Sequence, residues 1–148
     1  MQNLRRLLVL AVPALLVACA SGPKMSEVSA SIPGLKPDQA RIYVYRSNSM
    51  LGAAIQPKVM LNGKAVGESK PGGFFFVDVA PGAMEVTTTS EVEKKLSFTV
   101  AAGQTRYVRT SVGLGVLVYR VYPELVDNAE GAKEMADSSY IGTPLSKR

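Results

Sequence analysis

The sequence predicts a mainly β protein: an antiparallel β-sandwich of about seven or eight strands with a short C-terminal helix. Short apolar runs of β character recur between residues 40 and 125, and turns that contain Gly or Pro separate them. This regular spacing is typical of a sandwich or barrel. The chain has 148 residues, so we expect a single folded domain, and residues 40–136 are sufficient for one core.

The first runs predict a buried strand followed by a hairpin. In RIYVYR (41–46) two aliphatic side chains share one face of a strand and two tyrosines share the other. A loop follows. KVMLNGKAVGES (58–69) then predicts a hairpin, because Asn62-Gly63 favours the positive φ angles of a type I′ turn.

The later runs predict paired strands and then a helix. Asp127 precedes the helical pattern and is a suitable N-cap. Residues 137–148 are expected to be a frayed tail. The elements expected in this part are a strand–turn–strand unit around Pro81-Gly82 (74–89), a second around Ala102-Gly103 (94–112), an apolar strand (115–125) and a helix (127–136).

The N-terminus has the layout of a signal peptide. Arg5 and Arg6 precede an apolar run from Leu7 to Ala20, which small residues close. The alternative is a retained membrane helix. A spanning helix needs about 20 apolar residues, whereas this run is shorter and contains Pro13. We therefore expect residues 1–18 to be removed.

The end of this run resembles the lipobox of bacterial lipoproteins. Leu16-Val17-Ala18-Cys19 has an aliphatic residue, two small or branched residues and then the single cysteine of the chain. The resemblance implies cleavage between Ala18 and Cys19, a diacylglyceryl thioether on the Cys19 sulfur, and acylation of the new amine. Cys19 is then consumed as a membrane anchor, and apart from this covalent lipid we expect no cofactor and no metal.

The residues after Cys19 indicate location and a spacer. Ala20 and Ser21 follow the cysteine, where an Asp would resemble the signal for retention in the inner membrane. We therefore expect the periplasmic face of a bacterial outer membrane. Residues 19–39 are rich in Ser, Pro, Gly and Ala and predict a flexible tether, although Ile32 and Leu35 have the alternative of docking on the domain.

Composition argues against several functions. Loss of Arg5 and Arg6 leaves 15 of the 17 basic residues against 12 acidic ones, a weak and dispersed positive charge with no nucleic-acid footprint. The chain has no histidine, and its one cysteine is expected to be acylated, so an imidazole base, a thiol nucleophile and the usual zinc ligands are missing. We therefore expect no enzyme and no catalytic residues.

Two stretches are candidate partner or ligand surfaces. GGFFF (72–76) places Phe75 on the opposite face from its two neighbours, so Phe75 is either core or an exposed aromatic platform. SVGLGVLVYRVY (111–122) carries Gly113 and Gly115 within an apolar strand. Glycine there marks a bulge, a bend or a close backbone approach, or alternatively a partner edge or membrane-facing loop.

Residues 38–136 resemble the bacterial lipoproteins of the domain-of-unknown-function family 2846 (DUF2846). The resemblance implies a lipid-anchored β-domain and no particular activity. The Pro-Gly turn is also similar to that of carboxypeptidase-regulatory-like and PEGA-type modules, which are non-catalytic sandwiches. The motifs are the initial strand (40–46), the Asn62-Gly63 hairpin, the aromatic strand leading into Pro81-Gly82 (74–86), the Gly-interrupted strand (112–122) and the acidic helix (127–135).

We therefore expect a non-enzymatic, lipid-anchored envelope protein whose periplasmic sandwich binds or scaffolds another envelope component, with an envelope protein as partner. One alternative is a small-ligand or glycan-binding module that uses the phenylalanine region. Another is a component similar to the type VI secretion outer-membrane lipoprotein, which is also a short lipidated sandwich. The oligomeric state and the identity of the partner are left open by the sequence.

Overall fold

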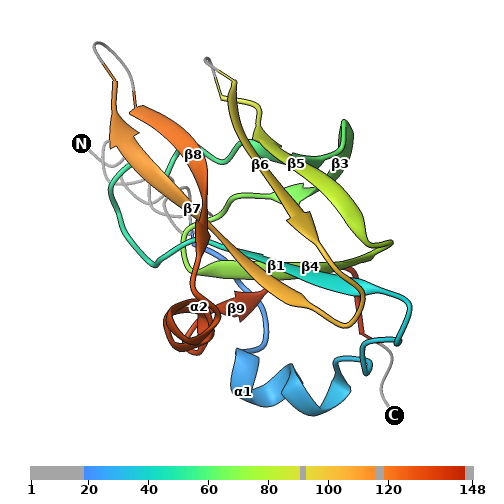
Figure 1. Ribbon diagram of the computed structural model, residues 1–148. Coiled ribbons are helices and arrows are strands. Elements are labelled where there is room, and N and C mark those ends of the chain that lie inside the picture. The colour runs from blue at the N-terminus through green and yellow to red at the C-terminus, as the bar shows by residue number, and fades with distance from the viewer. Residues whose placement is uncertain (1–18, 91–92, 116–118, 146–148) are drawn as a thin grey trace, which may run out of the picture.

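Two β-sheets face each other in the computed structural model of the protein, which describes residues 19–90, 93–115 and 119–145 (Figure 1). Within these residues the predicted mainly β sandwich with a C-terminal helix is confirmed. The five-stranded sheet contains, in spatial order, β8 (Tyr119–Val126), β7 (Thr105–Leu114), β1 (Ala40–Tyr45), β4 (Gly73–Val79) and β9 (Ser139–Tyr140). The four-stranded sheet contains, in order, β3 (Lys64–Glu68), β2 (Lys58–Leu61), β5 (Gly82–Thr88) and β6 (Lys94–Val100).

The five-stranded sheet includes two parallel pairs, β1–β7 and β4–β9, beside its antiparallel ones. Between β1 and β7 the chain passes through the whole four-stranded sheet, so no hairpin dictates their relative direction. The largely antiparallel sandwich that the sequence predicts thus contains parallel pairs that a local pattern does not reveal.

Strand β1 is buried along its whole length and separates two apolar clusters. Ile42 and Val44 lie in the core between the sheets. Tyr43 and Tyr45 point to the outer face of the five-stranded sheet, as the alternation in residues 41–46 predicts. The outer cluster there contains, besides these tyrosines, Val28, Phe74, Met135 and Tyr140.

Of the three turns that the sequence analysis named, one closes a hairpin and two link the sheets. Asn62 has φ 48° and Gly63 has φ 80°, and together they join β2 to β3 in the predicted type I′ hairpin. The turns at Pro81-Gly82 and Ala102-Gly103 do not close hairpins. Each carries the chain from one sheet to the other, because β4 and β7 belong to the five-stranded sheet and β5 and β6 to the four-stranded one.

The C-terminal part covers the outer face. Helix α2 (Asn128–Met135) begins as predicted at Asp127, whose carboxylate accepts a 2.8 Å hydrogen bond from the Ala129 N–H. The following tail is not frayed at residues 139–140, which form β9 beside β4. The Tyr140 ring lies 5.4 Å from the Phe74 ring, centroid to centroid, so the exposed aromatic face of β4 explains why the tail is ordered here.

Residues 20–35, expected to be part of a flexible tether, also pack on this face. They form α1 (Met25–Val28) and the 3₁₀ turn η2 (Ser29–Ser31), seen below the sheet in Figure 1. Lys24 forms a β-bridge with Ser139, and the Val28 side chain is buried. The tether prediction is therefore corrected, because this segment satisfies the open edge of β9 and covers the outer apolar cluster.

None of the helices formed by the described residues is long and apolar enough to span a bilayer. The predicted signal peptide, residues 1–18, lies outside the residues that the structure describes.

Candidate functional site

Cys19 is exposed and lies at the point where the chain joins the domain. One residue later the Ala20 N–H donates a 3.0 Å hydrogen bond to the Pro71 carbonyl, in the turn before β4. Further along, the Pro23 carbonyl accepts a 2.8 Å hydrogen bond from the Tyr140 N–H. A group attached to the Cys19 sulfur would therefore lie directly against the folded domain. Ala18, the other half of the predicted cleavage site, lies outside the described residues.

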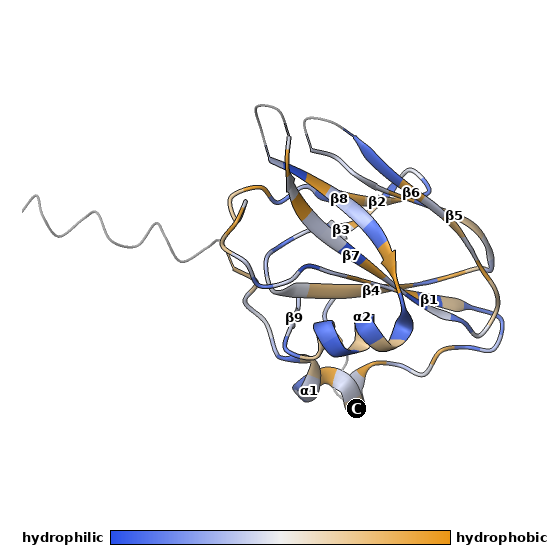
Figure 2. Cartoon of the chain, turned by 60° about the vertical axis from the view of Figure 1, so that its left-hand side comes forward, coloured by the Kyte–Doolittle hydropathy of each residue, from blue (hydrophilic) through white to orange (hydrophobic). Residues whose placement is uncertain are grey.

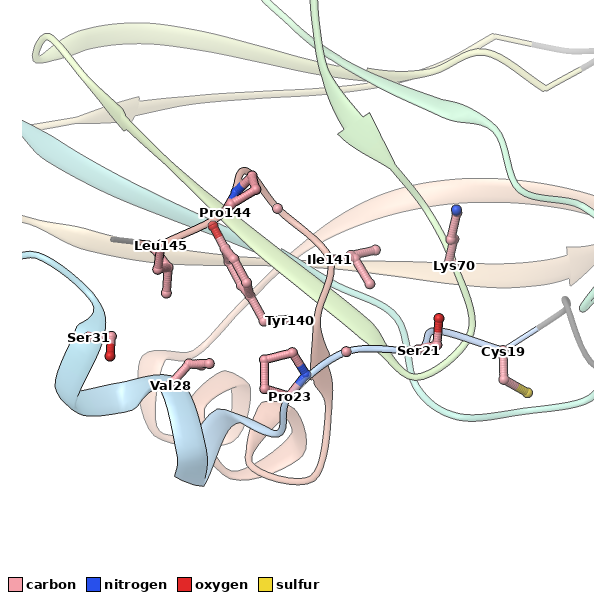
Figure 3. A pocket seen from close by; sticks show the side chains of 12 residues that line it. Cys19, Ser21, Pro23, Val28, Ser31, Lys70, Tyr140, Ile141, Pro144 and Leu145 are labelled. Atoms are coloured by element: carbon pink, nitrogen blue, oxygen red, sulfur yellow. The ribbon is translucent and has the colours of Figure 1, made fainter. Parts of the chain in front are cut away.

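A groove of about 720 Å³ begins at Cys19 and runs between the N-terminal segment and the C-terminal tail. Figure 3 shows Cys19 at one end of it, with its sulfur turned away from the Tyr140 ring. Of the described lining residues only Lys70 is charged, and its ammonium pairs with Glu68 at 3.2 Å. The Tyr140 hydroxyl donates to the Thr143 carbonyl at 2.7 Å, and burial raises the pKa of this tyrosine. This lining is suited to holding an apolar or neutral group, because the one charged side chain among its described residues is already paired.

Phe75 is not a surface residue. It is 2% exposed and belongs to the core between the sheets. Its ring lies so close to Gly67 of β3 that a Cβ at Gly67 would lie 2.7 Å from it. The prediction that Phe75 forms an exposed aromatic platform is therefore wrong, and the alternative, that Phe75 is a core residue, is confirmed.

Gly113 marks a close approach rather than a bend. Strand β7 continues through it in unbroken register with β8, where Gly113 pairs with Arg120. A Cβ on Gly113 would lie 2.7 Å from the Tyr122 ring, which explains why a glycine is needed there. Gly115 follows the end of β7 and is partly exposed, and residues 116–118 after it lie outside the described residues.

The loop after β1 is ordered by a buried arginine that the sequence analysis did not single out. Arg46 is 2% exposed. Its guanidinium donates to the carbonyls of Ile55 at 2.7 Å and Gly52 at 2.9 Å, with longer bonds to those of Leu51 and Ser69. Burial lowers the pKa of Arg46. The available signal was a positive charge that directly follows the run Ile42–Tyr45.

A second buried arginine fixes the N-terminal segment. Arg41 donates to both oxygens of Asp78 at 2.6 and 2.8 Å and to the Pro33 carbonyl at 2.8 Å. Its guanidinium carbon also lies 4.5 Å from the centre of the Phe76 ring. The hydrogen bond from Arg41 to Asp78 raises the pKa of Arg41. Asp78 alternates with Val77 and Val79 along β4, a pattern that by itself indicates a residue facing solvent, but the ion pair is covered by the chain at Pro33.

The densest group of ionisable side chains docks α2 on the sheet. Arg109 of β7 contacts the carboxylates of Glu124, Glu130 and Glu134 at 2.9–3.3 Å. The buried Tyr45 hydroxyl donates to Glu134 at 2.6 Å. This bond lowers the pKa of Glu134, and burial raises the pKa of Tyr45. Because every member bonds to another member, the cluster is organised to hold the helix rather than to move a proton.

Comparison of the sequence with known protein families assigns the chain to one of them. The family model "Protein of unknown function (DUF2846)" matches residues 36–121, more than half of the chain. The chain belongs to the DUF2846 family. An uncharacterized protein of Haemophilus influenzae (strain ATCC 51907 / DSM 11121 / KW20 / Rd) is 29% identical over 140 residues, which cover 91% of this chain and 83% of that protein.

No solved structure matches this DUF2846 protein. The family match extends from the end of the N-terminal segment, through both sheets, into β8. The match to the Haemophilus protein covers most of both chains. Neither the family description nor the relative gives a sign of enzymatic activity.

Proposed function

We propose that this DUF2846 protein is a non-enzymatic lipoprotein of the bacterial envelope, anchored by a lipid on Cys19 at the periplasmic face of the outer membrane, whose sandwich binds another envelope component. The position of Cys19 carries this proposal. An exposed thiol directly follows the lipobox-like residues, and the folded structure begins at the next residue. Two or three acyl chains there would give stable membrane attachment.

The arrangement of charges supports binding rather than catalysis. Arg41, Asp78 and Arg109 are engaged in bonds that fasten the N-terminal segment and α2 to the sheet. Among the described residues no group of His, Cys, Asp and Glu is arranged to hold a metal ion. The described ionisable clusters thus have structural partners, and the proposal needs none of them for chemistry.

The edge of β3 is the best place for a partner strand. Both end strands of the five-stranded sheet already bond to other parts of the chain. The N-terminal segment bridges β9 at Ser139, and the Thr88 hydroxyl donates to the Val121 carbonyl of β8 at 2.6 Å. Strands β3 and β6 end the four-stranded sheet; β6 lies against β8, whereas the Ala65 side chain of β3 is exposed. An unpaired strand edge can accept a strand from another protein.

The anchor is tested by labelling cells that express the full chain with a radioactive fatty acid. The wild-type protein and a Ser21→Ala control should carry label, whereas Cys19→Ser should carry none and should retain residues 1–18. The chain has a single cysteine, so label on Cys19→Ser cannot come from another thiol and would contradict the anchor.

Binding is tested in the same cells with a photo-crosslinking amino acid at Ala65 or, as a matched control, at the exposed Ala101 in the turn after β6. We expect a discrete crosslinked envelope component at Ala65 and little at Ala101. Equal, diffuse products at both positions would contradict the β3 edge as a binding surface.

A second candidate function is the binding of a small ligand in the groove beside Cys19. The groove has a volume of about 720 Å³ and a lining of polar and apolar residues, so it is a better ligand site than the phenylalanine region, where Phe74 and Phe75 are buried. A ligand there would protect Ile141 and Leu145 from solvent, so an uncharged fluorescent probe such as N-phenyl-1-naphthylamine should bind the wild type and lose affinity in Ile141→Asn. Equal binding by both proteins would count against the groove.

A further inference from the structure

We propose that the domain lies directly on the bilayer that holds its lipid, in one fixed orientation, with Met50, Leu51 and Leu114 in contact with the lipid. This inference rests on the proposed lipidation of Cys19 and adds to it a second membrane contact, made by the folded domain itself. These three residues and Tyr119 are called the apolar flank below.

The first argument is that no spacer separates Cys19 from the domain. Ala20 is bound to Pro71 at 3.0 Å, and consecutive Cα atoms are about 3.8 Å apart. The hydrogen bonds from Tyr140 to Pro23 and from Met25 to Ser138 continue this attachment. A lipid on Cys19 in a bilayer would therefore bring the surface around Ala20 to the membrane.

The second argument is that this surface continues to the loop after β1. The turn at Gly72-Gly73 lies between Ala20 and this loop. A Cβ on Gly73 would lie 3.0 Å from the Ala20 Cβ, and a Cβ on Gly72 would lie 3.3 Å from the Cβ of Asn48 in the loop. The same loop reaches β7, where a Cβ on Gly52 would lie 2.7 Å from Val112. In Figures 1 and 2 this loop and the start of the described chain lie on the same side of the domain.

The third argument is what this side exposes. Met50 is 76% exposed, Leu51 51% and Leu114 80%, and Tyr119 pairs with Leu114 across the β7–β8 ladder. The apolar flank thus holds four of the six large hydrophobic side chains that are exposed among the described residues. Figure 2 shows the loop as a hydrophobic stretch beside the point where the described chain begins.

The bilayer is the occupant that this arrangement favours. Gathered apolar side chains on a soluble domain mark an interaction surface, and a tyrosine at its border suits the interface between lipid and water. Arg46 holds the loop by its backbone carbonyls, so Met50 and Leu51 stay exposed without the loop collapsing onto the core. A partner protein would have to share this side with the acyl chains, which already place it against lipid.

The absence of tryptophan from the chain allows a direct test. Single variants Met50→Trp and Leu114→Trp are purified as the processed lipoprotein and reconstituted in vesicles of phosphatidylethanolamine and phosphatidylglycerol. Leu125→Trp is the matched control. Leu125 is 39% exposed on the same hairpin and pairs with Val108, six residues before Leu114, a separation of about 20 Å.

We expect tryptophan at positions 50 and 114 to emit at shorter wavelength in vesicles and to be quenched by brominated lipid several-fold more than at position 125. Equal, weak quenching at all three positions would overturn the inference, as would an emission change that depends on protein concentration and not on lipid, which indicates contact between copies.

Mass spectrometry of each preparation separates the two proposals. A protein without lipid on Cys19 overturns both the anchor and the inference built on it. A lipidated protein without quenching at positions 50 and 114 overturns only the inference and leaves the anchor in place.

Discussion

Replacement of Arg46 by methionine should destabilise the domain strongly, because four backbone carbonyls have been arranged around one guanidinium. Methionine has similar length but donates no hydrogen bond. The acceptors on Ile55 and Gly52, at 2.7 and 2.9 Å, would lose their partner. The more distant bonds to Leu51 and Ser69, both at 3.3 Å, contribute less.

The magnitude follows from these two short bonds. A buried polar group left without a partner costs about 1–3 kcal/mol, so two carbonyls cost about 2–6 kcal/mol. The variant is relieved of the cost of burying a charge, which offsets part of this loss. We expect a net loss of about 3 kcal/mol in the free energy of unfolding, or about 10 °C in Tm for a domain of this size. Arg46→Lys should lose less, because its ammonium still donates to some of these carbonyls.

Urea denaturation followed by circular dichroism measures the loss, and Arg106→Met supplies the control for the same chemical change. The Nε of Arg106 is buried without a hydrogen-bond partner among the described residues, so replacement of this arginine by methionine should leave the free energy of unfolding unchanged or raise it. Amide hydrogen exchange should also show the loop at residues 47–57 exchanging faster in Arg46→Met. Equal midpoints for the two methionine variants would refute the argument that these carbonyls depend on Arg46.

Two further predictions concern the core and the helix. Phe75→Ala should lower the free energy of unfolding by about 3–5 kcal/mol in urea denaturation, because the ring fills the space between the sheets; a loss below 1 kcal/mol would contradict its burial. Glu134 has a lowered pKa, so its contribution to stability is present above its unfolded pKa of about 4.3 and is lost as the pH falls through the lower folded value. Between about pH 5 and 3, Glu134→Gln should therefore lose less stability than the wild type, and identical pH profiles would show that the Tyr45–Glu134 contact does not contribute.

Features that depend on neighbouring residues were predictable from the sequence. The alternation in residues 41–46 fixed which side chains of β1 face the core, and Asn62-Gly63 fixed the hairpin angles. Asp127 marked the start of α2. In each case the physical cause lies within a few residues, in side-chain periodicity, in the conformational freedom of a turn or in a local hydrogen bond.

Features that depend on distant partners were not predictable in this way. The alternation of Asp78 with its strand neighbours indicates only which face of β4 it lies on, whereas its partner Arg41 lies on the adjacent strand. The composition of residues 19–39 is that of a linker, yet α1 covers a cluster contributed by β1, β4 and α2. Composition describes a segment by itself, while order depends on the surface available to it.

The ordered N-terminal segment also changes what the anchor would do. A flexible tether would let a lipidated domain sample many orientations, and its partner could approach from any side. With Ala20 fixed to Pro71, lipid on Cys19 would hold the domain at one orientation and keep the apolar flank at the bilayer. The β3 edge ends the other sheet and would then be held at one fixed angle to the bilayer. A partner bound there would meet a prealigned strand edge, so the rigidity of residues 20–24 should matter for partner binding as much as for attachment.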